Sequence, residues 1–130
     1  MLTNKDLAIY RLSQADECLN DAKMALENGS YKNAANRSYY CVFHCMRSLL
    51  ALEQVDFKKH SAVISHFRKN YIKTEIFETQ LSDTLELLFE VRAASDYDDF
   101  YVVNKGDIEK QIKSAEYFFD QIAEYLHKQI

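Results

Sequence analysis

The sequence contains no proline and only two glycines in 130 residues. These are the residues that end helices and form tight turns, so a chain that nearly lacks them has few turns and long uninterrupted elements. The depletion favours helices over a β-sandwich, which needs a turn after every short strand. A chain of this length also suits one hydrophobic core and is too short for two. We therefore expect a single all-α domain over residues 1–130.

Apolar residues recur at helical spacing in several long segments. The predicted helices cover residues 4–28, 31–54 and 60–71, a fourth that Thr74 caps, and a last that begins at Asn104 or at 106–107. The stripe of the last helix consists of Ile108, Ile112, Ala115, Phe119, Ile122 and Leu126. Alternating steps of four and three residues place such a stripe on one helical face. Long helices with short connections predict an antiparallel up-and-down bundle of four to five helices.

The charge and hydropathy of the chain exclude several classes of protein. The formal net charge is -4, whereas a general nucleic-acid coat protein is basic; a local contact with RNA stays open. No run of about 18 apolar residues is present, which predicts no association with a membrane. The polar amino-terminal residues lack the apolar core of a signal peptide. We expect a cytoplasmic protein whose three cysteines are reduced thiols.

Two features predict self-association. The second predicted helix is apolar over more than one face, and the chain has nine tyrosines and eight phenylalanines. A lone bundle of this size does not bury all of that surface, so a symmetric homodimer is expected. The loop predicted at residues 97–106 is also rich in aromatic residues, and we expect it to pack against the bundle.

Arg92 occupies a position where an apolar residue is expected. The stripe before it is Phe77, Leu81, Leu85 and Leu88. An arginine that faces a core needs a partner, because an unpaired buried charge is costly. Asp96 follows four residues later on the same helical face. Arg92 and Asp96 are therefore either a structural ion pair or part of a functional site.

The second predicted helix carries a polar line. Its members are Arg37, Tyr40, His44 and Arg47, at spacings of three, four and three residues. If this face meets the end of the fourth helix, the side chains share one cleft with Asp96. Such a cluster suits a phosphate or an RNA backbone, and His44 is a candidate proton carrier for acid–base chemistry. The alternative is a solvated helix face.

The short third helix is locally basic. It contains Lys58, Lys59, His60, Ser61, His66, Arg68 and Lys69. This segment is either a patch that binds anions or a solubilising surface.

No cofactor or metal ion is expected. Cys41, His44 and Cys45 lie close together on one helix, but metal sites normally draw ligands from at least two elements, so core cysteines are the better interpretation. The sequence has no glycine-rich phosphate loop, no GxSxG and no HExxH. Nucleotide-kinase, serine-hydrolase and zinc-hydrolase activities therefore have no support.

Three segments resemble motifs of one branch of the HEPN family. NRSYYCVFH at residues 36–44 is similar to its NRxYYAxFH helix, and KHSAVISHF at 59–67 is similar to its KHSxVIxxF segment. RAASDY at 92–97 is similar to the helix end written RxxADY. The order and the spacing of the segments fit, and the resemblance covers nearly the whole chain.

The resemblance implies a helical bundle that dimerises and that is often encoded beside a minimal nucleotidyltransferase in a toxin–antitoxin-like pair. Many active members are metal-independent RNases whose signature is an arginine followed, after four to six residues, by a histidine. Counted from Arg92, the histidine would fall at a position that holds Tyr97, Asp98 or Asp99. The usual general acid or base is therefore missing, unless folding brings His44 or His60 close.

Three hypotheses follow from the residues and the resemblance. The first is a non-catalytic, homodimeric binding module for RNA or a nucleotide, with a minimal nucleotidyltransferase as partner. Its candidate binding residues are Arg37, Tyr40, His60, Asp96 and Tyr97. The second is a metal-independent RNase toxin that uses Arg92 with a displaced histidine, and His44 is the candidate. The third, implied by the resemblance alone, is that the partner adds adenylate to Tyr97 or Tyr101.

Overall fold

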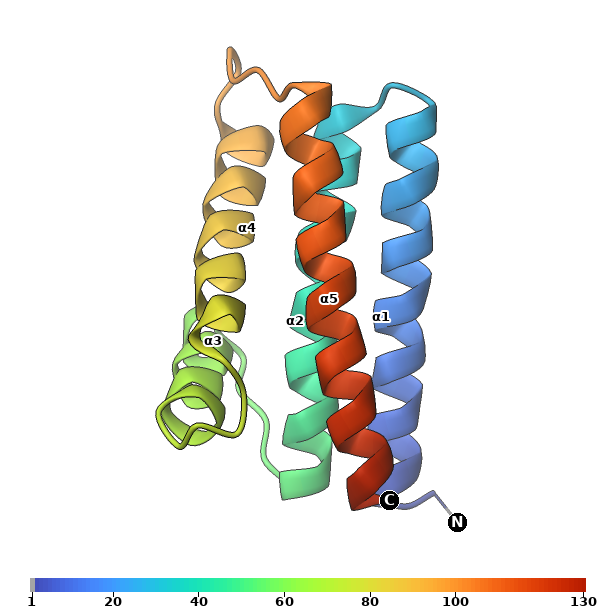
Figure 1. The fold of residues 1–130 in the computed structure, drawn as a ribbon, viewed down its shortest axis with the longest axis vertical. Helices are drawn as coiled ribbons and strands as arrows, with labels where there is room; N and C mark the ends of the chain where they lie inside the picture. The colour runs from blue at the N-terminus through green and yellow to red at the C-terminus, as the bar shows by residue number, and fades with distance from the viewer. Residues whose placement is uncertain (1) are drawn as a thin grey trace.

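The computed structural model describes residues 2–130, and every regular element in that range is a helix (Figure 1). The elements are α1 (Asn4–Glu27), α2 (Tyr31–Glu53), α3 (His60–Phe67), the π-helical segment η1 (Arg68–Ile72), α4 (Thr79–Tyr97) and α5 (Lys105–Gln129). The four long helices alternate in direction, and the two chain ends lie at the same end of the bundle (Figure 1). The predicted antiparallel all-α bundle is confirmed. None of the helices within residues 2–130 is long and apolar enough to cross a membrane.

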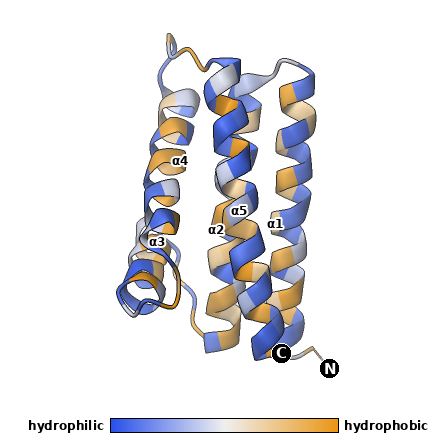
Figure 2. Cartoon of the chain, in the orientation of Figure 1, coloured by the Kyte–Doolittle hydropathy of each residue, from blue (hydrophilic) through white to orange (hydrophobic). Residues whose placement is uncertain are grey.

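The core is built around α2, which packs against α1, α3, α4 and α5. Figure 2 shows that apolar residues recur along each long helix between hydrophilic ones. In α5 the predicted stripe needs one correction, since Phe118 is fully buried and Phe119 only half-buried. The ring of Phe118 packs against Phe67 of α3, with the ring centres 5.5 Å apart. The tertiary contact with α3 therefore decides which of the two rings is fully buried.

The predicted cap of the fourth helix is wrong. Thr74 donates its hydroxyl hydrogen bond backwards to the carbonyl of Asn70, and α4 begins only at Thr79. Between them the chain turns at Glu75, whose φ of 62° lies in the left-handed region that does not continue an α-helix. Phe77 is buried before the helix starts. This turn brings Phe77 onto the core and delays the helix.

The loop between α4 and α5 packs only in part, so the prediction for it is half wrong. Tyr101 and Val103 are half-buried and pack against the core, whereas Phe100 and Val102 are 95% and 84% exposed. Successive side chains of an extended segment point to opposite sides. The loop therefore covers the core with alternate residues and presents the others to solvent.

The two adjacent phenylalanines of α5 test this packing. Replacing Phe118 by alanine should lower the free energy of unfolding by about 3–5 kcal/mol, the usual cost of emptying a fully buried phenylalanine site. The Phe119→Ala variant should lose clearly less, because that ring is already half-exposed. Urea denaturation followed by circular dichroism measures both values. Equal losses would contradict the assignment of Phe118 to the core.

Candidate functional site

Helix α2 and the carboxyl-terminal end of α4 meet at the side chain of Arg92. Its Nη2 donates a hydrogen bond of 3.0 Å to the hydroxyl of Tyr40, and its Nε lies 2.9 Å from Oδ2 of Asp96. The Nε–H does not point at that carboxylate oxygen, so this contact is an ion pair without a directed hydrogen bond. Only 16% of the Arg92 side chain is exposed. A charge this buried depends on its partners, as the break in the apolar stripe predicts.

Aromatic rings surround the same guanidinium group. Its carbon lies 5.4 Å from the ring centre of Tyr39, 5.3 Å from that of Tyr40 and 6.0 Å from that of Tyr97. These distances lie within the range of a cation–π interaction, which favours a desolvated arginine over the face of a ring. Tyr97 itself remains 74% exposed. Arg92 is therefore held by rings on two elements as well as by a carboxylate.

The network continues along α2 through Asn36 and Arg37. The amide nitrogen of Asn36 donates to Asp96 Oδ2 at 3.3 Å, and its amide oxygen accepts from Nε and Nη2 of Arg37 at 3.0 and 2.6 Å. The Arg37 guanidinium also lies 5.2 Å from the ring centre of Tyr40. Two arginines therefore approach one tyrosine ring; Asp96 pairs with Arg92, and Asn36 links Asp96 to Arg37.

The first residue of α3 brings a histidine to this group. His60 Nδ1 and the Tyr39 hydroxyl are joined by a hydrogen bond of 2.8 Å. The imidazole stacks on Phe43 with the ring centres 4.1 Å apart and meets Tyr40 edge-on at 5.9 Å. We call the residues joined in this way the Arg92 cluster: Asn36, Arg37, Tyr39, Tyr40, His60, Arg92 and Asp96.

Both histidines near the cluster favour the neutral form. Burial, and then the positive charge of Arg92 and of Arg47, lowers the pKa of His60 below 6.5. Burial and the charges of Arg47, Arg37 and Arg11 likewise lower the pKa of His44. Tyr39 keeps its proton, because burial raises the pKa of its hydroxyl well above the usual value. At neutral pH the arginines are therefore the positive charges of this region.

His44 lies beside the cluster. Its ring centre is 6.2 Å from that of Tyr40 and 5.9 Å from that of Phe43. Its Nδ1 is buried and has no hydrogen-bond partner within residues 2–130. His44 therefore approaches the rings of the cluster without joining its hydrogen bonds.

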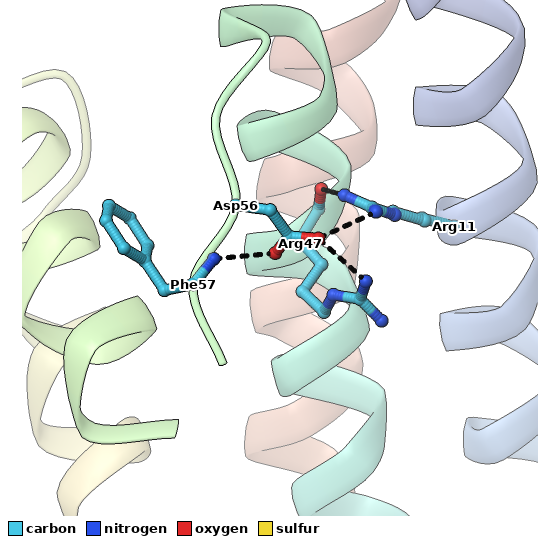
Figure 3. A network of polar contacts seen from close by, with 4 residues as sticks. All are labelled: Arg11, Arg47, Asp56 and Phe57. Atoms are coloured by element: carbon cyan, nitrogen blue, oxygen red, sulfur yellow. Dashed lines mark hydrogen bonds and ion pairs between the residues drawn. The ribbon is translucent and has the colours of Figure 1, made fainter. Parts of the chain in front are cut away.

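Arg47, the fourth residue of the predicted polar line, belongs to a different network (Figure 3). Asp56 Oδ2 accepts hydrogen bonds of 3.2 Å from both Arg47 and Arg11, and Arg11 also donates to the carbonyl of Arg47 at 3.0 Å. Burial raises the pKa of the Asp56 carboxyl, but the bond from the Phe57 amide and the two arginines outweigh it and lower the pKa overall. This network fastens the loop after α2 to α1, so the predicted line is divided between two sites.

Some side chains of the basic segment at residues 58–69 form contacts within the protein. His66 Nε2 lies 3.0 Å from a carboxylate oxygen of Glu53, and Arg68 donates to the hydroxyl and the carbonyl of Ser82. Lys58, Lys59 and Lys69 are exposed, as a solubilising surface requires. The three cysteines are buried, which agrees with their interpretation as core residues.

Sequence reasoning missed several members of these networks. Tyr39 is fully buried in α2, and nothing in the spacing separates a core tyrosine from one that also contacts an arginine. Arg11 did carry a signal: it lies three residues after Ala8 and four before Ala15, on the buried face of α1. The partner roles of Asn36 and Asp56 depend on contacts between distant segments, which the spacing does not indicate.

The chain belongs to the HEPN family, because the family profile described as "HEPN domain" matches residues 8–125. It is 34% identical over 113 residues to a UPF0332 protein of Thermotoga maritima, with 87% of this chain and 86% of that protein covered. It is 31% identical over 128 residues to a Methanocaldococcus jannaschii protein named "Putative toxin MJ0605", with 96% and 95% covered. These relatives span nearly the same length as this chain.

A solved structure has the same fold. The crystal structure of ST0689, described as an archaeal HEPN homologue, superposes with a TM-score of 0.70 at 20% sequence identity. The match covers 97% of this chain and 99% of that one. The five α-helices of residues 2–130 therefore form a HEPN fold.

The neutral histidines predict a dependence of stability on pH. Histidine in an unfolded chain has a pKa near 6.5, and burial places the pKa of His60 in the folded chain below that value. Between the two values the unfolded chain binds more protons, so the free energy of unfolding should fall as the pH drops below about 6.5. His60→Gln removes one titrating group and should reduce this loss. Urea denaturation at about pH 7.5 and about pH 5 measures it; identical losses in both proteins would contradict the prediction.

Proposed function

We propose that this HEPN-domain protein is the toxin-like member of a two-protein system and acts as a homodimeric module that binds the phosphate groups of RNA or of a nucleotide. The observation that carries the proposal is the composition of the Arg92 cluster. The guanidinium groups of Arg37 and Arg92 lie 5.2 and 5.3 Å from the ring centre of Tyr40, and Asp96 is the one carboxylate within the cluster. The excess positive charge favours phosphate, and the exposed ring of Tyr97 beside Arg92 offers a surface on which a base can stack.

The contacts that hold the Arg92 guanidinium group favour phosphate binding over RNA cleavage. Its Nη2 donates to Tyr40 and its Nε lies 2.9 Å from Asp96 in an ion pair, which leaves Nη1, a group with no hydrogen-bond partner within residues 2–130, free for a ligand. An arginine held in this way contributes a fixed positive charge. No histidine follows it at the spacing of the RNase signature. Tight positioning of charge without a histidine at the spacing of the RNase signature suits recognition of a phosphate.

The surface beside the cluster supports a homodimer. Phe100, Val102 and Tyr97 are strongly exposed apolar or aromatic side chains at the end of α4 and in the loop that follows it. Contiguous exposed apolar residues typically mark a protein contact, and a symmetric dimer covers the same patch on both subunits. In such a dimer the two Arg92 clusters would lie near the shared face.

The family supports a minimal nucleotidyltransferase as the second protein of the system. Two relatives are named "Putative toxin", and the resemblance to the family implies that such proteins are encoded beside a nucleotidyltransferase partner. Co-elution of the two purified proteins from a gel-filtration column tests this part of the proposal. Separate elution at micromolar concentrations would contradict it.

The second candidate function is that of a metal-independent RNase. One observation favours it: His60 reaches the rings of Tyr39 and Tyr40, over which the Arg92 guanidinium also lies. A neutral histidine is the form that can accept a proton from a ribose hydroxyl, and Arg92 would stabilise the charge that develops on the phosphate. His44 is the other candidate for this role, since its ring lies near that of Tyr40.

One experiment separates the two functions. A labelled single-stranded RNA of about 20 nucleotides is mixed with the protein in EDTA, and sedimentation velocity reports the mass of the protein and the bound fraction of the RNA. A gel of the same samples reports cleavage. For the module we expect a dimer and intact RNA, and Arg92→Ala should weaken binding by about tenfold or more, the usual effect of losing a charge-assisted hydrogen bond.

Two control variants separate the effect of the Arg92 side chain from a general effect of charge. Lys113→Ala removes the same charge from an exposed position on α5 and should bind like the wild type. Arg92→Lys retains the charge and should bind better than Arg92→Ala. Cleavage by the wild type that Arg92→Ala abolishes would establish the RNase function instead. Equal binding together with equal cleavage by the wild type and the Arg92→Ala variant would refute both roles of Arg92.

A further inference from the structure

We propose that the groove between α3 and α4 is a docking site for a basic, partly apolar segment of a partner protein. The groove has a volume of about 280 Å³ and is lined by residues of α3, η1 and α4. Figure 1 shows α3 near the end of the bundle where α4 begins. Three of the groove's eight lining residues are apolar, namely Ile64, Leu85 and Phe89, and the other five are polar or charged. This surface borders the Arg92 cluster, because Phe89 meets Tyr39 with the ring centres 5.8 Å apart, but none of its lining residues belongs to that cluster.

The two walls of the groove differ in chemistry. Ser61 and Ser65 of α3 place two hydroxyl groups one helical turn apart on one side. Glu86 and Glu90 of α4 place two carboxylates one turn apart on the other side. An apolar surface between hydroxyls and carboxylates suits a ligand with hydrocarbon stems and positively charged ends.

The carboxylates lack a cation of their own. Neither Glu86 nor Glu90 makes an ion pair or a side-chain hydrogen bond within residues 2–130. Arg68 also lines the groove, but Ser82 accepts hydrogen bonds from its Nε and Nη2 at 2.9 and 3.3 Å. Two like charges four residues apart on one helix face destabilise that helix. A cation from outside the chain would remove this repulsion.

Charge complementarity selects the occupant. Lysine and arginine carry an apolar stem, which can lie along Phe89 and Ile64, and a head that can reach a carboxylate. A second copy of this chain has a net charge of -4, so it is a poor counterpart for an acidic groove. RNA is repelled by Glu86 and Glu90. The fitting partner is therefore a protein segment that alternates basic and apolar residues.

A synthetic peptide provides the probe. A fluorescein-labelled helix of about 15 residues, with lysine on one face and leucine on the next, is titrated with the protein and followed by anisotropy. A peptide of the same design with glutamate in place of lysine should not bind. Glu86→Gln combined with Glu90→Gln should weaken binding by about five- to tenfold, and Ser65→Trp, which fills the groove, should weaken it at least as much.

The matched control removes the same charge elsewhere. Asp16→Asn combined with Glu17→Gln acts on exposed carboxylates of α1 and should leave the affinity for the lysine peptide unchanged. Amide shifts in an NMR titration should concentrate in α3 and α4. Equal weakening by the α1 variant, unchanged binding by Ser65→Trp, or shifts elsewhere would overturn the proposal. A wild-type dimer that Ser65→Trp converts to a monomer would also overturn it, since a second copy would then occupy the groove.

Discussion

The guanidinium group of Arg92 connects parts of the chain that are distant in sequence. It lies at the end of an apolar stripe, where a charge without partners would oppose folding. Tyr40 of α2 accepts its hydrogen bond, Asp96 balances its charge, and the ring of Tyr39 contacts its face. Asn36 extends the arrangement from Asp96 back to α2. Satisfying this one buried charge therefore fixes how the end of α4 sits on the central helix.

The same requirement shapes the chemistry of the region. Burial, and then the charges of the arginines, lower the pKa of His44 and His60, so positive charge resides in groups that do not titrate near neutral pH. A site of this kind is well suited to hold an anion and less suited to supply a proton. The separate network of Arg11, Arg47 and Asp56 anchors the loop that leads to His60 (Figure 3). It therefore positions His60, and the charge of Arg47 also lowers the pKa of that histidine.

The sequence predicted the helices and the importance of Arg92, because both depend on local spacing. The scarcity of proline and glycine predicts long helices, and apolar residues at steps of three and four locate them. Neither signal requires knowledge of the neighbouring helices. The division of the polar line was not predictable, since Arg47 pairs with Asp56, a residue of a loop whose path the spacing does not reveal. The spacing also failed to predict that Phe118 rather than Phe119 is fully buried and that α4 begins only at Thr79. Both outcomes depend on contacts with other elements, which the spacing of one helix does not contain.

A double-mutant cycle on Arg92 and Tyr40 tests the central claim most directly. The free energy of unfolding is measured by urea denaturation for the wild type, Arg92→Met, Tyr40→Phe and the double variant. If the two side chains hold α2 and α4 together as described, the sum of the two single-variant losses in unfolding free energy should exceed the loss in the double variant. The difference should be about 1 kcal/mol or more. Losses that add within about 0.3 kcal/mol would show that Arg92 does not depend on Tyr40 and would contradict this account.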